Sequence, residues 1–173
     1  MGAKNREAKT IHERLQEQFP DWDHTLKKRD KFSIREKGAC YRLEKLGGCE
    51  NVDYQVDGGL IPKVDTDNPK CDHLLLIRVS ETEWIHVFIE LKGTDVKHGL
   101  EQLKATLRHS LFNSLAPNER RVARLVGRSM PSSKNNPEID RLKQSITKLD
   151  CDIKIMKSNQ VEDFGALKQL VGL

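Results

Sequence analysis

Three ionisable residues stand at the ends of two short apolar runs, at a spacing that should bring them together. Asp72 precedes the run 73–77, and Glu90 and Lys92 end the run 84–92. Runs so short and so close together, rich in branched and aromatic residues, predict an antiparallel β-hairpin. The start of one strand then lies beside the end of the other, so Asp72 and Glu90 should meet. Because strand side chains alternate between faces, Glu90 and Lys92 should share a face.

Two carboxylates and an ammonium group at one end of a sheet can hold a hard divalent cation. A carboxylate at the end of an apolar strand loses hydration, and a bound cation offsets that loss. Mg²⁺ takes oxygen ligands, typically one or two carboxylates with water and phosphate oxygens, and it activates water and stabilises charge on phosphate. Lys92 would position or deprotonate that water, or neutralise the developing charge. The plainer alternative is a solvated Glu90–Lys92 pair, with Asp72 as a turn residue.

These residues resemble the signature of the PD-(D/E)XK phosphodiesterase superfamily, the fold of many restriction enzymes, Holliday-junction resolvases and repair nucleases. That signature has an acid at the start of the second core strand and (D/E)-X-K on the third. Asp72 matches the first position, and Glu90, Leu91 and Lys92 match the second motif. The resemblance extends over roughly residues 33–157. It departs from the pattern at the proline, which is Pro69 instead of the residue directly before the acid.

The resemblance implies an α/β fold with a restriction endonuclease-like core in the order α-β-β-β-α-β, a mixed central sheet flanked by helices. It also implies a Mg²⁺-dependent nuclease that hydrolyses phosphodiester bonds, with Mn²⁺ as a substitute and DNA expected before RNA. Asp72, Glu90 and the Leu91 carbonyl would bind the metal, and Lys92 would orient the attacking water.

Two other interpretations remain open. One is a non-catalytic nucleic-acid-binding or interaction protein that retains the nuclease fold, with the acids serving structure. The other is a nuclease subunit that acts within a homodimer or a larger complex, since no reading module of a known kind is visible. The intact set of Asp72, Glu90 and Lys92 favours the enzyme over the non-catalytic protein.

The flanking segments predict the elements that position this set, as a central mixed sheet of four or five strands. Ser33 opens a capping box and Gly47 begins a stop signal, so we expect a helix over 34–46. Further elements follow from alternation, apolar stripes and capping signals. We expect strands at 52–56, 122–126 and 151–155, helices at 96–111, 137–149 and 161–170, and loops at 57–71 and 127–136.

Length and composition predict one domain. The chain of 173 residues has no Ser/Gly/Pro-rich linker, so we expect a nuclease-like domain over 33–173 and an N-terminal helical extension over 1–32, with an amphipathic segment at 10–19. No apolar stretch reaches the length of a membrane span and no signal peptide is visible, so we expect a cytoplasmic protein without a membrane partner.

The four cysteines lack Cys-x-x-Cys spacing, which favours free thiols over a metal cluster.

The net charge of +4 is nearly balanced, so local clusters carry more information than the total. Lys63 and Lys70 precede Asp72, and Arg124 and Arg128 belong to a second basic cluster. Such residues can contact phosphates without reading sequence, and the alternative for each is a solvated surface.

Two residues are candidates for an extended active site. Gln102 lies one helical turn after His98, on a face away from the apolar stripe. In exonuclease-like branches of the superfamily a glutamine lies on this helix near the active site, followed by a tyrosine whose position is Thr106 here. Glu44 or Glu36, from the helix expected over 34–46, would supply a third carboxylate. Solvent-facing positions are the alternative for all of them.

Overall fold

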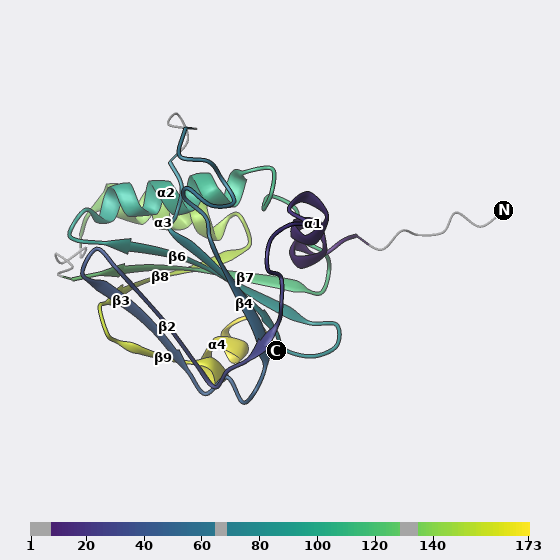
Figure 1. Ribbon diagram of the computed structural model, residues 1–173. Helices are drawn as coiled ribbons and strands as arrows, with labels where there is room; N and C mark the ends of the chain where they lie inside the picture. Colours follow the sequence, from purple (N-terminus) through teal and green to yellow (C-terminus); the bar gives the residue numbers. More distant parts are fainter. Residues whose placement is uncertain (1–7, 65–68, 129–134) are drawn as a thin grey trace.

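A mixed six-stranded sheet forms the centre of the protein (Figure 1). The computed structural model describes residues 8–64, 69–128 and 135–173. Three central strands form an antiparallel meander, and the last two strands continue the sheet in parallel. In spatial order the strands are β1 (Lys27–Lys28), β4 (Glu50–Gln55), β5 (His73–Arg78), β6 (Trp84–Lys92), β7 (Glu119–Gly127) and β8 (Cys151–Lys157).

Different layers cover the two faces of this sheet (Figure 1). Helices α2 (Val96–Arg108) and α3 (Pro137–Thr147) lie on one face. A three-stranded sheet of β2 (Lys31–Glu36), β3 (Ala39–Glu44) and β9 (Val161–Asp163) covers the other, with α4 (Phe164–Leu170). Helix α1 (Ile11–Gln18) lies at one end of the central sheet. Among the described residues no helix has both the length and the apolar character needed to cross a membrane.

Side-chain alternation along the central strands creates two cores. Leu74 and Leu76 of β5 pack in the cluster that includes α2 residues, whereas Leu75 and Ile77 pack in the cluster that includes β3. Strands covered on both faces become near-continuous apolar runs, and β6 is buried along its length up to Lys92. This explains why the runs 73–77 and 84–92 are so strongly apolar.

Crossover helices join the parallel strands, as parallel pairing requires. Helix α2 connects β6 to β7, and α3 connects β7 to β8. The Asp95 side chain caps α2 by accepting the His98 N–H, and Asn136 caps α3 in front of Pro137. The expected strands and helices from residue 50 to 157 are confirmed, within a few residues at their ends. The loops expected over 57–71 and 127–136 lie partly outside the described residues.

The expectation of a helix over 34–46 is wrong. This segment belongs to a β-hairpin in which Ser33 pairs with Arg42 and Arg35 with Cys40. Lys37 and Gly38 form its two-residue turn, with φ angles of 53° and 73°. Two positive φ angles are the requirement of the turn that matches the twist of a hairpin. The α/β class and the mixed, helix-flanked sheet are therefore confirmed, but a hairpin replaces the first helix expected in the core order.

Other boundaries also differ from expectation. The central sheet has six strands instead of four or five. Residues 161–163 form strand β9 before the closing helix begins at Phe164. Helix α1 confirms the amphipathic segment near the N-terminus, whereas residues 27–28 join the central sheet.

The four cysteines are free thiols.

Candidate functional site

Asp72 and Glu90 meet at one end of the central sheet. The Asp72 N–H donates to the Ile89 carbonyl at 3.1 Å, which extends the β5–β6 ladder by one step. One carboxylate oxygen of Asp72, Oδ2, accepts the Leu91 N–H at 2.8 Å. Asp72 is 4% exposed and Glu90 is fully buried. The pairing expected from the two apolar runs is confirmed, and both carboxylates lie in a poorly hydrated place.

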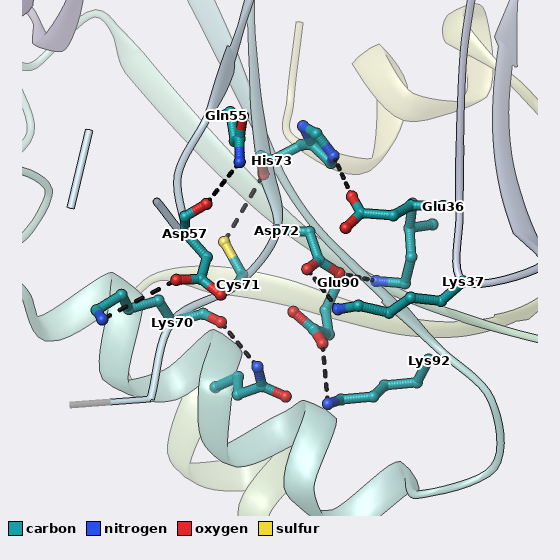
Figure 2. Close-up of polar contacts among 12 residues, drawn as sticks. Glu36, Lys37, Gln55, Asp57, Lys70, Cys71, Asp72, His73, Glu90 and Lys92 are labelled. Atoms are coloured by element: carbon teal, nitrogen blue, oxygen red, sulfur yellow. Dashed lines mark hydrogen bonds and ion pairs between the residues drawn. The ribbon is translucent and has the colours of Figure 1, made fainter. Parts of the chain in front are cut away.

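Two lysines approach these acids from different elements (Figure 2). The Lys92 ammonium lies 3.4 Å from Glu90 Oε1, on the same strand. The Lys37 ammonium comes from the β2–β3 turn and lies 2.7 Å from Asp72 Oδ1. The sequence predicts Lys92 at this place but not Lys37, because the capping signals predict a helix in the segment that contains Lys37. The alternation of apolar residues over 31–44 was the signal that could have revealed it.

The surroundings of Glu90 disfavour the charged form of its carboxylate. Burial raises the pKa of Glu90 to about 8 and the negative charge of Asp72 adds to this, while Lys92 and Lys37 act in the opposite direction. Within the described part of the chain neither oxygen of Glu90 has a hydrogen-bond partner. The Lys92 ammonium is within ion-pair distance of Oε1 but lacks the alignment of a hydrogen bond. Buried acceptors without partners are rare and unfavourable.

The donor set at this sheet end matches the one that Mg²⁺ takes. The N–H and C=O of a strand residue point to the same side, so the Leu91 carbonyl points toward Asp72 as the Leu91 N–H does. No group of three or more His, Cys, Asp and Glu side chains suited to a metal exists in residues 8–64, 69–128 and 135–173. Two carboxylates and a carbonyl leave positions for water and phosphate oxygens, which is how Mg²⁺ is usually bound. The Glu90 oxygens, which accept no hydrogen bond among the described residues, are the observation that fits such a cation.

Helix α2 holds the two residues that precede Asp72. The Gln102 side-chain amide donates to the Lys70 carbonyl at 2.8 Å, and the Cys71 N–H donates to Thr106 Oγ1 at 2.8 Å. The Thr106 hydroxyl donates in turn to the Gln102 carbonyl at 2.8 Å. The expectation that Gln102 lies on a face away from the core is corrected, since it is buried beside the site. Gln102 therefore contacts the backbone segment that leads into Asp72.

Gly99 lets α2 approach the strand that carries Lys92. A Cβ atom at this position would lie 2.5 Å from Leu125 Cδ1 and 3.2 Å from Lys92 Cγ. The absence of a side chain at Gly99 thus leaves room for the aliphatic stem of Lys92, which is 16% exposed at its side chain.

Two of the four basic candidates are buried, which corrects their expected role. Arg124 is fully buried on the face of the three-stranded sheet. Its guanidinium lies 2.7 Å from Glu162 Oε1 and 3.0 Å from Asp152 Oδ2. Lys70 is 6% exposed, and its ammonium donates to the Pro62 carbonyl at 3.1 Å. Neither cation is presented to a phosphate backbone, because both are turned into the protein.

Arg128 and Lys63 are exposed and keep their place as candidates for phosphate contact. The Arg128 stem lies against the β2–β3 turn, since a Cβ at Gly38 would be 2.8 Å from Arg128 Cδ. Arg128 therefore lies next to the turn that brings Lys37 to Asp72.

The candidates for a third carboxylate lie elsewhere. Glu44 is at the opposite end of β3 from the turn and pairs with Arg42 at 3.0 Å, so its expected place in the site is wrong. Glu36 is closer, but its carboxylate lies 2.9 Å from His73 Nε2 and belongs to that pair. His98 is half exposed beside Glu101 and lies outside the site.

Comparisons of the chain with protein-family models, with curated proteins and with solved structures find no match. The functional assignment therefore depends on the geometry of the sheet end and on the chemistry of its residues.

Proposed function

We propose that the protein is a Mg²⁺-dependent nuclease that hydrolyses phosphodiester bonds, with DNA as its main substrate. One observation carries the proposal: a fully buried glutamate whose two oxygens have no hydrogen-bond partner in the described residues faces a second buried carboxylate. A hard cation with open coordination positions would satisfy both acids, and a lysine already lies 3.4 Å from one of them.

The residues of the sheet end have distinct roles in this scheme. Asp72, Glu90 and the Leu91 carbonyl would hold the cation, which when bound polarises a phosphoryl oxygen and activates water. The hydrogen bond from the Leu91 N–H fixes the orientation of the Asp72 carboxylate. Lys92 shares a face with Glu90 and orients the attacking water or neutralises charge that develops on the phosphate. Arg128 contributes positive charge near the site for an incoming phosphate backbone.

A non-catalytic nucleic-acid-binding protein is the second candidate, and one observation favours it. Both oxygens of Asp72 are already engaged, by the Leu91 N–H at 2.8 Å and by the Lys37 ammonium at 2.7 Å. A carboxylate that serves structure would be bound in this way. This second candidate leaves unexplained why the buried Glu90 oxygens accept no hydrogen bond among the described residues, which is why we propose the enzyme first.

The test is cleavage of linear, circular, single-stranded and branched DNA, with RNA in parallel, in Mg²⁺ or Mn²⁺. We expect Asp72→Asn and Glu90→Gln to lose both cleavage and Mn²⁺ binding in calorimetry. Lys92→Met should lose cleavage by about 100-fold or more and retain Mn²⁺ binding, because an ammonium is not a metal ligand. Glu44→Gln, an acid at the far end of β3, is the control.

Robust cleavage in excess chelator would exclude the metal-dependent scheme. Activity of Lys92→Met equal to that of the unaltered protein would remove the lysine from it.

A further inference from the structure

The turn between β2 and β3 carries a lysine to the end of the central sheet from the face opposite α2. Glu36 anchors one side of this turn through its 2.9 Å contact with His73. On the other side the Arg128 stem packs against Gly38. Between them, the Lys37 ammonium lies 2.7 Å from Asp72 Oδ1 (Figure 2). These two contacts position the turn that carries Lys37, while the lysine side chain itself extends to Asp72.

The two partners of this ion pair differ in their freedom to move. Asp72 is 4% exposed at its side chain, and its second oxygen is fixed by the Leu91 N–H. Lys37 is 43% exposed at its side chain, so its long stem can turn toward water without unfolding the turn. The pair can therefore open on the side of the lysine while the carboxylate stays in place.

The position of the ammonium is also the position that a cation would need. Oδ1 is the Asp72 oxygen that the Leu91 N–H leaves open, and the Glu90 carboxylate, whose oxygens accept no hydrogen bond among the described residues, lies beside Asp72 (Figure 2). An ammonium and a divalent cation cannot both contact Oδ1 at short range, because like charges repel strongly at such a distance.

We propose that Lys37 is a displaceable counterion of the metal site, which holds Asp72 in the metal-free protein and leaves when a divalent cation binds. This inference depends on the metal site of the proposed function, and it deepens it by naming the group that competes with the metal. The competition lowers the affinity of the site for its cation, because the ion pair with Asp72 must be broken first.

The test is a calorimetric titration with Mn²⁺ alone, without nucleic acid. An opposite charge beside a carboxylate typically favours the charged form over the neutral form by about tenfold to a thousandfold. Lys37→Met should therefore bind Mn²⁺ about tenfold more tightly than the unaltered protein, or tighter still, and Lys37→Gln should do the same.

The chain offers a matched control in Lys45, at the other end of the same hairpin. Its ammonium lies 2.7 Å from Asp163 Oδ2, so Lys45→Met removes an ion pair of equal length and the same charge. Lys45→Met should leave the Mn²⁺ affinity unchanged. Asp72→Asn in the Lys37→Met protein should abolish the tighter binding.

An affinity of Lys37→Met and Lys37→Gln equal to or weaker than that of the unaltered protein overturns the proposal. The outcome is separable from that of the nuclease assay, since the titration needs no substrate. Tighter binding by the Lys37 variants without any cleavage would uphold the counterion and refute the nuclease. Absence of Mn²⁺ binding in the unaltered protein and both variants would refute both proposals.

Discussion

Replacing Glu90 with glutamine should stabilise the metal-free protein at alkaline pH and remove much of the pH dependence of its stability. Glu90 is fully buried, and burial followed by the charge of Asp72 raises its pKa from an ordinary 4.5 to about 8. In the unfolded chain the same carboxyl ionises at its ordinary pKa. Between these two values the folded protein holds a proton that the unfolded chain has lost.

The sign and size of the effect follow from this difference. Because the folded state binds more protons, the contribution of Glu90 to stability is fully present below pH 4.5 and is lost as the pH rises through about 8. At about 1.4 kcal/mol for each pKa unit, the interval corresponds to roughly 5 kcal/mol. Only about three of these pKa units lie above pH 5, so we expect a loss of about 3–4 kcal/mol between pH 5 and pH 9.

The assay is urea unfolding in chelator at pH 5, 7 and 9. The free energy of unfolding of Glu90→Gln should match that of the unaltered protein at pH 5 and exceed it increasingly toward pH 9. Glu44→Gln, whose carboxylate is partly exposed beside Arg42, should show no such trend. Added Mg²⁺ should recover the lost stability in the unaltered protein and do little for Glu90→Gln. A difference within about 1 kcal/mol at all three pH values would refute the reasoning.

Three further predictions concern the fold and the surroundings of the site. Arg124→Met should lower the free energy of unfolding, measured with urea, by about 3–5 kcal/mol, because Glu162 would be left buried without its partner. Arg128→Met should leave the free energy of unfolding unchanged and make the salt dependence of nucleic-acid binding shallower. Thr106→Val leaves the buried Cys71 N–H without an acceptor, so it should cost about 1–3 kcal/mol and weaken Mn²⁺ binding. Thr106→Ser, which keeps the hydroxyl, should restore both.

The sequence predicted the centre of the fold and the two acids because both depend on strong local patterns. The runs at 73–77 and 84–92 are apolar enough to require burial on two faces, and their short separation requires an antiparallel pair. The register then follows, and it places Asp72 against Glu90. The crossover helices were equally legible, since α2 has an apolar stripe and α3 begins with Asn136 and Pro137.

The hairpin over 31–44 could not be assigned in the same way. Ser33 and Glu36 have the spacing of a capping box, which favours a helix in isolation. The decisive interactions are remote in sequence: Tyr41 donates to Glu162, and β3 pairs with β9. Tertiary packing outweighs a local capping signal. The consequence reached the site itself, because Lys37 was hidden by the helix assignment.

Arg124 shows a second limit, in which charge alone suggested the wrong role. A cluster of arginines in a sequence has the same appearance whether it faces water or a buried acid. The apolar run 122–126 offered a better guide. An arginine inside a buried strand is rarely placed there without an acidic partner. The partner, Glu162, lies 38 residues further along the chain, so no local pattern could identify it.

The treatment of buried acids elsewhere in the chain supports the proposal that Glu90 binds a cation. Glu162 accepts the Tyr41 hydroxyl at 2.8 Å and pairs with Arg124. Glu119 accepts two backbone N–H groups, at 2.6 and 2.7 Å. Asp72 has partners for both oxygens. Of the buried carboxylates in the described part of the chain, Glu90 is the one whose oxygens lack hydrogen bonds, although it is fully buried. One oxygen of the partly buried Glu83 also lacks a hydrogen bond among the described residues, whereas Glu90 is fully buried and lacks hydrogen bonds at both oxygens. A cation bound at the sheet end would satisfy both of them.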